Sequence, residues 1–190
     1  MPNTSVWHGC YDGAWQGLIV PEAFTHPAKF SRALIHRLYR HLLEQRYVEP
    51  GMTILDPFGG CALGALDAMT YHLAYVGCEL EPRFVALGQQ TLALWRQRFG
   101  FTTGVLVQGD SRQLRAVLEG TFQGLVTSPP YVRSIHEGNG IDLAQLDLTL
   151  PPAGRHSQAK AQGYGTTPGN LGNLPAGAVD HLFRQGAPHA

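Results

Sequence analysis

Four consecutive residues, Ser128-Pro129-Pro130-Tyr131, form the most chemically specific pattern in this sequence. Two adjacent prolines remove two backbone donors and fix a rigid turn. Such a turn presents a serine hydroxyl, carbonyl oxygens and an aromatic face. The hydroxyl and a carbonyl oxygen can accept hydrogen bonds from an amino group, and the tyrosine ring can stack on a flat base. The pattern predicts a site for a planar ring bearing an amino group; the alternative is a structural turn with a packed tyrosine.

A second pattern, Asp56-Pro57-Phe58-Gly59-Gly60, follows a short apolar run. Glycines at the end of a strand let the backbone approach a ligand, and the proline stiffens the turn. The phosphate-binding pattern GxxxxGK[ST] is absent, and the glycine spacing does not fit GxGxxG. The turn therefore favours a nucleotide-like ligand without a pyrophosphate, with an ordinary glycine-rich connection as the alternative.

Two acidic residues follow two further apolar runs. Glu79 comes about twenty residues after the glycine turn, the spacing at which an acid binds the ribose hydroxyls of a cofactor. A solvated acid at the start of a helix is the alternative for Glu79, and Glu81 is a weaker candidate for the same role. Asp110 could accept from an adenine amino group, but we expect it chiefly to cap the helix that follows.

The surrounding sequence predicts the elements that would hold these residues together. Short apolar runs are expected as strands at 52–55, 74–78, 104–108 and 123–127. Helices are expected at 29–47, from the glycine turn to about 70, at 82–98 and at 111–119, with Ser31 or Thr25 capping the first. Strands alternating with helices predict an α/β fold with a parallel, doubly wound sheet. Such sheets bind ligands beyond the carboxyl ends of their strands, where all the residues above lie.

Composition limits the class of protein further. The chain has 190 residues and a formal net charge of zero, so it lacks the basic excess typical of DNA-binding proteins. Only Lys29 and Lys160 of its 14 basic residues are lysines, and arginine suits phosphates and base edges. The three cysteines have no metal-ligand spacing, so we expect reduced thiols, no metal and a cytoplasmic location. Neither a signal peptide nor a membrane-spanning run is evident.

Together these motifs resemble those of the DNA amino-methyltransferases, which modify cytosine N4 or adenine N6. The turn at 56–60 resembles their DPFxGxG cofactor loop, although Ala62 stands where a last glycine is common. The turn at 128–131 resembles their catalytic [DNS]PP[YFW] tetrapeptide, and Glu79 resembles their ribose-binding acid. The segment 26–30, with Lys29 and Phe30, resembles the element that packs at the methionine end of the cofactor. The resemblance covers roughly residues 24–135.

The resemblance implies a Rossmann-like methyltransferase fold with S-adenosylmethionine as cofactor. It implies that Lys29, Phe30, the 56–60 turn, Glu79 and Asp110 bind this cofactor. A target base flipped out of double-stranded DNA would then enter the pocket. Ser128 and the carbonyl of Pro129 would accept from its amino group, beside Pro130 and under the stacked ring of Tyr131.

The identity of the target base follows from the first residue of the tetrapeptide. Serine at this position favours cytosine N4, as in methyltransferases of restriction–modification systems. Adenine N6 transfer, an RNA methyltransferase and an inactive cofactor-binding fragment are the alternatives.

The resemblance also sets an expected domain organisation. We expect an irregular segment at 1–25, a cofactor-binding and catalytic core at 26–135, and a Gly/Pro-rich, loop-rich tail at 136–190 that contributes to target recognition. Members of the family have seven strands, whereas this sequence predicts four. We therefore expect a chain truncated after the catalytic turn, or one whose sheet a second chain completes.

Overall fold

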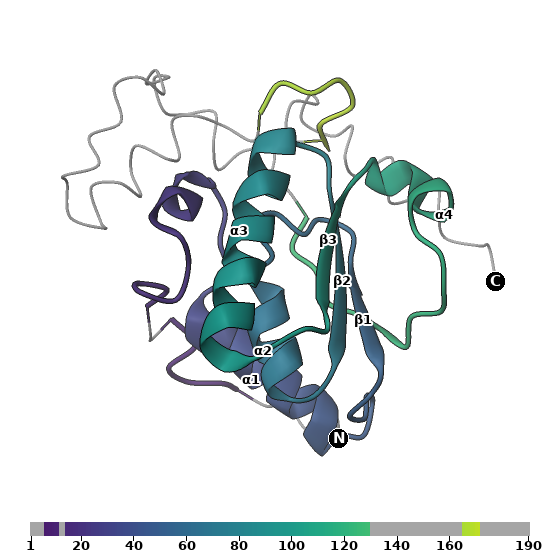
Figure 1. Ribbon diagram of the computed structural model, residues 1–190. Helices are drawn as coiled ribbons and strands as arrows, with labels where there is room; N and C mark the ends of the chain where they lie inside the picture. The colour runs from purple at the N-terminus through teal and green to yellow at the C-terminus, as the bar shows by residue number, and fades with distance from the viewer. Residues whose placement is uncertain (1–5, 12–13, 130–164, 172–190) are drawn as a thin grey trace.

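A computed structural model describes residues 6–11, 14–129 and 165–171 of the chain. Four parallel strands form one sheet in the order β3-β2-β1-β4 (Figure 1). The strands are β1 (Thr53–Asp56), β2 (Ala74–Glu79), β3 (Gly104–Gln108) and β4 (Gly124–Leu125). The α/β fold with about four parallel strands, predicted from the alternation of apolar runs, is confirmed.

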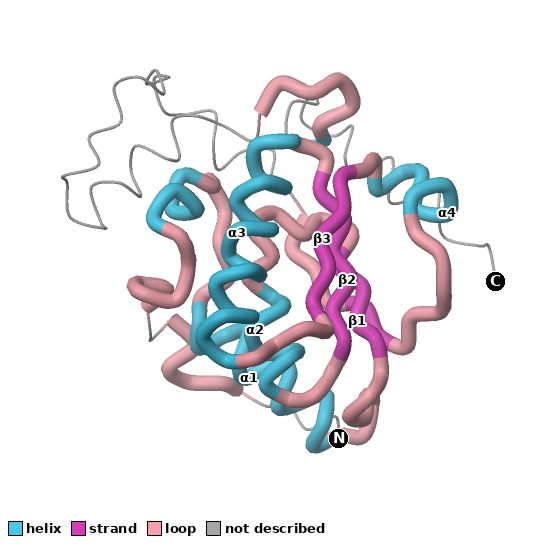
Figure 2. Tube along the Cα trace, in the orientation of Figure 1, coloured by secondary structure: helices cyan, strands magenta, loops and turns pink. Residues whose placement is uncertain are grey.

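Helices cover both faces of this sheet. On one face lie α1 (Arg32–Glu44), α2 (Gly64–Thr70) and α3 (Pro82–Phe99). On the other face lies the short α4 (Leu114–Val117), which follows the 3₁₀ helix η2 (Ser111–Gln113), as Figure 2 shows. The doubly wound arrangement is therefore present, with the larger layer on the side of α3. Among the described helices none is long and apolar enough to cross a membrane.

The register of the sheet brings the candidate residues to one edge. Asp56, the last residue of β1, pairs with Gly77 of β2, and Glu79 at the end of β2 pairs with Gln108 of β3. On the other side of β1, Leu55 pairs with Leu125 of β4. Because the strands are parallel, their carboxyl ends meet at this edge, which is where α/β sheets bind ligands.

The hydrophobic core fills the space between the sheet and the larger helical layer. Trp95 and Phe84 of α3 are almost fully buried there, against Ile54 and Tyr75 of the sheet. An amphipathic helix buries its apolar face against another layer. In α3, which has 18 residues, the buried side chains run from Phe84 to Trp95. The site edge is therefore built on a rigid layer.

The N-terminal segment packs into this core. Trp15 and Ile19 are buried, and the indole nitrogen of Trp95 donates to the carbonyl of Leu18 at 2.5 Å. The described residues of this segment contain one 3₁₀ helix, η1 (Pro21–Thr25), and are otherwise irregular. Trp15 also donates to the carbonyl of Phe30 at 2.7 Å, which fixes the chain just before α1.

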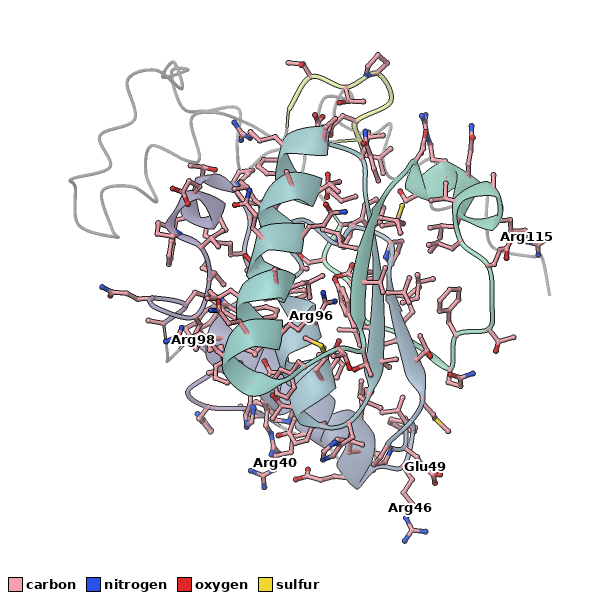
Figure 3. The ribbon with its side chains drawn as sticks, in the orientation of Figure 1. Arg40, Arg46, Glu49, Arg96, Arg98 and Arg115 are labelled. Atoms are coloured by element: carbon pink, nitrogen blue, oxygen red, sulfur yellow. The ribbon has the colours of Figure 1, made fainter. Side chains whose placement is uncertain are left out.

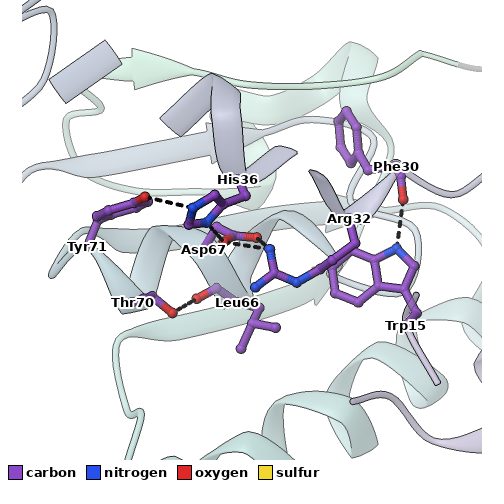
Figure 4. Close-up of polar contacts among 8 residues, drawn as sticks. All are labelled: Trp15, Phe30, Arg32, His36, Leu66, Asp67, Thr70 and Tyr71. Atoms are coloured by element: carbon purple, nitrogen blue, oxygen red, sulfur yellow. Dashed lines mark hydrogen bonds and ion pairs between the residues drawn. The ribbon is translucent and has the colours of Figure 1, made fainter. Parts of the chain in front are cut away.

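A buried carboxylate ties α1 to α2 (Figure 4). Asp67 is fully buried and accepts from the Arg32 guanidinium at 2.7 and 2.8 Å and from His36 Nδ1 at 2.9 Å. The Arg32 guanidinium also lies over the ring of Trp15, 5.5 Å from its centroid. Charge-assisted bonds of this kind fix geometry strongly. The network holds the start of α1, and with it the preceding segment 26–30, in place.

Three predicted elements are shorter in the structure. The helix expected at 29–47 begins only after Ser31, whose hydroxyl donates to the carbonyl of Cys10 instead of capping α1. The helix expected at 111–119 is divided into η2 and α4, and the strand expected at 123–127 is a two-residue pairing. At the start of α1 the bond from Ser31 to Cys10 is a tertiary contact, which local periodicity does not encode.

Candidate active site

A single pocket at the carboxyl edge of the sheet collects residues from the ends of all four strands. Its walls include residues 57–61 after β1, Glu79 after β2, Asp110 after β3 and Ser128 after β4. Residues of the 26–30 segment and residues 169–171 complete it. The structure therefore brings together the motifs that the sequence spreads over more than a hundred residues.

The loop after β1 leaves its backbone open to the pocket. A Cβ on Gly59 would lie 2.7 Å from Leu106 Cδ1 and 3.3 Å from Gly77 Cα, so glycine lets this loop lie close to β2 and β3. Gly60 has φ +52°, and a Cβ there would lie 3.0 Å from the His26 ring. Ala62 also has a positive φ of 60°. This left-handed conformation explains why glycine is common at that position in the resembling family.

Glu79 organises this loop. One carboxylate oxygen accepts from the Gly60 amide at 2.9 Å, and the other accepts from the Glu81 amide at 2.8 Å. Burial raises the pKa of the Glu79 carboxyl, while these backbone donors lower it. Each carboxylate oxygen can accept a second bond. The side chain therefore holds the glycine loop and keeps acceptor capacity for hydroxyl groups in the pocket.

Asp56 takes a different position from the one its place in the loop motif implied. It is 1% exposed and is not part of the pocket wall. Its carboxylate accepts from the Phe58 amide at 3.1 Å, from the Tyr75 hydroxyl at 3.0 Å and from the Thr127 hydroxyl at 2.7 Å. Burial raises its pKa to about 6. Asp56 thus joins the loop, β2 and the end of β4 from behind the pocket.

The contact with Thr127 places the next residue, Ser128, on the pocket wall. This is the position predicted for the acceptor of an amino group, at the end of β4. Pro129 follows it within the described residues, whereas Pro130 and Tyr131 lie outside them. The predicted carbonyl and stacking roles of Pro129, Pro130 and Tyr131 remain predictions.

Asp110 behaves as the predicted helix cap. It accepts from the Arg112 amide at 2.9 Å and pairs with the Arg112 guanidinium. The hydrogen bonds from Arg112 lower the pKa of the Asp110 carboxyl. Both Asp110 and Ser111 also line the pocket. Capping and a contact with a ligand are therefore compatible at this residue.

The segment 26–30 forms the wall next to the glycine loop. Phe30 lines the pocket, and the Lys29 ammonium donates to the Phe24 carbonyl at 3.1 Å and to the His26 carbonyl. His26 is buried against Phe84, with ring centroids 4.3 Å apart. Burial, with the positive charge of Lys29, lowers the pKa of His26 to about 3, so its imidazole is neutral. Lys29 and Phe30 both line the pocket, and their role at the methionine end of the cofactor remains a prediction.

Residues 169–171 of the pocket wall, and Glu81, which bonds to Asn170, carried little or no signal in the sequence. Glu81, a weak candidate, is 7% exposed and accepts three hydrogen bonds from Thr167 and Asn170. Residues 169–171 line the pocket about forty positions after Ser128. A Gly/Pro-rich stretch predicts a loop, but it does not predict which part of the fold the loop contacts. Among the described residues, no group of three or more His, Cys, Asp or Glu side chains could hold a metal ion.

Comparison with known proteins gives a distant relative. No protein-family model matches the chain. Over 105 residues the chain is 29% identical to a tRNA (guanine(10)-N2)-dimethyltransferase of Methanothermobacter thermautotrophicus. The match covers 55% of this chain and 30% of that protein, so the chain spans less than a third of the curated relative's length.

Solved structures give weak matches. TrmN from Thermus thermophilus is 21% identical with a TM-score of 0.42, covering 62% of this chain and 30% of that one. A methyltransferase from Pyrococcus furiosus is 22% identical with a TM-score of 0.39, covering 50% and 46%. TM-scores this low carry no argument about function. The class of protein that the motifs, the parallel sheet and the curated relative support is the S-adenosylmethionine-dependent methyltransferases.

Proposed function

We propose that this chain uses S-adenosylmethionine to methylate the exocyclic amino group of a nucleobase, with cytosine N4 in DNA as the preferred target. The observation that carries the proposal is the position of Ser128. Ser128, which carries a hydroxyl group, lines the same pocket as the glycine loop, Glu79 and Asp110. An acceptor for an amino group and a site for a nucleoside cofactor therefore share one cavity.

The residues present fit this cofactor. Gly59 and Gly60 line the pocket with backbone alone, and they pack closely against Leu106 and the His26 ring. Glu79 retains acceptor capacity for two ribose hydroxyls, and Asp110 and Ser111 can contact the adenine. The bound cofactor supplies an electrophilic methyl group on a positively charged sulfur.

The contribution of the chain itself is to position the acceptor. The Ser128 hydroxyl and the Pro129 carbonyl accept the amino hydrogens, which leaves the nitrogen lone pair directed away from them and into the pocket. A base in duplex DNA must leave the stack to reach such a turn, at a cost of a few kcal/mol. The catalytic effect is mainly one of orientation and of electrostatic complementarity to the developing positive charge on nitrogen.

A second target, an amino group in RNA, is favoured by one observation. The curated relative is a tRNA guanine-N2 methyltransferase, and its acceptor is also an exocyclic amino group. The serine of the tetrapeptide favours cytosine instead. The two candidates share the pocket and the chemistry, and they differ in the nucleic acid that presents the base.

Replacing Ser128 by alanine tests the proposed role of its hydroxyl. We expect Ser128→Ala to lower the methyl-transfer rate at saturating cofactor by about 100-fold, because one preorganised acceptor at the reacting amine is lost. The dissociation constant of S-adenosylhomocysteine should stay unchanged. Thr102→Ala is the matched control, because it removes an exposed hydroxyl in the loop before β3. An unchanged rate in Ser128→Ala would contradict the assignment.

A further inference from the structure

The segment 165–171 reaches the pocket from a distant part of the sequence. Asn170 and Leu171 are each 8% exposed, and both line the pocket together with Gly169. In Figure 1 this segment, drawn in yellow-green, crosses above the end of α3 at the carboxyl edge of the sheet. Burial of an asparagine and a leucine in this segment requires specific anchors on the rest of the fold.

Glu81 supplies the first anchor. Its carboxylate accepts from the Thr167 amide at 3.0 Å, the Thr167 hydroxyl at 2.7 Å and the Asn170 side-chain amide at 2.6 Å. A buried carboxylate is costly unless it is hydrogen-bonded, and these three donors satisfy that requirement. The Glu81 amide in turn donates to Glu79. One residue therefore connects the segment directly to the carboxylate that holds the glycine loop.

Close backbone approach supplies the second anchor. A Cβ on Gly165 would lie 2.2 Å from the Glu81 carboxyl carbon, and a Cβ on Gly169 would lie 2.1 Å from an Arg112 guanidinium nitrogen. Both glycines have positive φ, +106° and +89°. The backbone of the segment therefore packs closely against Glu81, which follows β2, and against Arg112, which follows β3. Glycine is required at both contacts.

The order of the strands shows at which end of the pocket this segment lies. Glu81 and Arg112 follow β2 and β3, whereas Ser128 follows β4 on the other side of β1. If the transferred methyl group faces Ser128, the nucleoside end of the cofactor faces β2 and β3. We propose that residues 165–171 close the pocket over the nucleoside, and that Glu81 is the positioning residue that holds them there. This inference rests on the proposed function for the orientation of the cofactor.

Binding measurements with the full chain test this proposal without a methyl acceptor. The probes are S-adenosylhomocysteine and adenosine, titrated by calorimetry. We expect Glu81→Ala and Asn170→Asp to weaken both probes by about tenfold or more, since the anchoring hydrogen bonds are lost or a second carboxylate faces the first. Glu81→Gln keeps one of the two acceptor oxygens, so its affinity for both probes should lie between that of these variants and that of the unmodified chain. Glu49→Ala, at the opposite end of the fold in Figure 3, should bind as the unmodified chain does.

Hydrogen exchange provides a readout that a purely structural role would not move. The Thr167 amide, which donates to Glu81, should exchange more slowly when S-adenosylhomocysteine is bound. If Glu81→Ala fails to fold, Asn170→Asp and this exchange measurement decide the question. Affinities within twofold of the unmodified chain in a folded Asn170→Asp variant, or unchanged exchange at Thr167, would overturn the proposal. If the unmodified chain transfers no methyl group to any base, but Glu81→Ala and Asn170→Asp still weaken binding of both probes, only the proposed function is overturned.

Discussion

At the scale of single residues, Asp56 shows how a motif residue can lie behind a pocket wall and bond to the residues that shape it. The sequence predicts it as a cofactor contact, because it begins the glycine turn. In the structure its carboxylate is buried among Phe58, Tyr75 and Thr127, behind the pocket wall. Sequence spacing located the residue correctly at the end of β1. It could not give the direction of the side chain, which depends on donors 19 and 71 positions away.

The raised pKa of Asp56 predicts a pH dependence of stability. Because burial raises this pKa from 3.8 to about 6, the folded protein prefers the protonated carboxyl. Between these two values the native state binds more protons than the unfolded state, so this residue's contribution to stability falls as the pH rises. The full difference corresponds to about 3 kcal/mol.

Asp56→Asn removes this titration. Relative to the unmodified chain, the variant should gain about 2 kcal/mol in free energy of unfolding between pH 4.5 and pH 8, the part of the full difference that lies above pH 4.5. Urea unfolding at several pH values measures it, and the comparison cancels the titrations that both proteins share. A difference between the two proteins that stays constant with pH would show that Asp56 titrates normally.

At the scale of elements, the local sequence predicts the middle of most helices and strands, whereas tertiary contacts decide features that the sequence does not predict. The cores of β1, β2, β3 and α3 follow from their apolar patterns and were predicted within one or two residues. The start of α1 was not, because it lies at a contact of Ser31 with Cys10, and the division of the helix after Asp110 into η2 and α4 was not predicted either. The docking of α1 on α2 through Asp67 had no signal in the sequence, since a lone aspartate in a helix usually faces solvent.

The Asp67 network predicts a large effect on stability. Asp67→Ala leaves the Arg32 guanidinium without its buried partner, so we expect a loss of about 3 kcal/mol in the free energy of unfolding. Glu44→Ala, which removes the exposed partner of Arg40, should change stability little. Denaturant unfolding of the two variants side by side makes the comparison. Equal, small losses would mean that the network does not fix α1.

At the scale of the whole molecule, the sequence predicted which residues share a site better than it predicted what completes it. Parallel strands with chemistry at their carboxyl ends imply one pocket, and Phe58, Glu79, Asp110 and Ser128 do line one. Residues 169–171 could not be predicted, because a Gly/Pro-rich stretch carries no periodicity that fixes its contacts. Most of the tail expected at 136–190 lies outside the described residues. The target-recognition role of that tail and a second chain beside β4 therefore remain predictions.

Charge adds a constraint at the same scale. The chain has no net charge, and Arg40 and Arg46 lie at the end of the fold opposite the pocket (Figure 3). Among the described cations, Lys29 lines the pocket, and the Arg112 guanidinium lies beside Gly169, which also lines it. With a formal net charge of zero we expect weak non-specific binding, because affinity for duplex DNA grows with the number of phosphates that basic side chains neutralise.

Transfer of labelled methyl from S-adenosylmethionine, followed by digestion to nucleosides, tests the central claim most directly. Mixed-sequence duplex DNA and unmodified tRNA transcripts serve as parallel acceptors, with Ser128→Ala and Thr102→Ala measured beside the unmodified chain. The account predicts label in N4-methylcytosine from DNA, lost in Ser128→Ala and kept in Thr102→Ala. Label in N2-methylguanine from tRNA would keep the amino-methyltransferase and move its target to RNA. No label in any base amino group, from a chain that binds S-adenosylhomocysteine, would contradict the account.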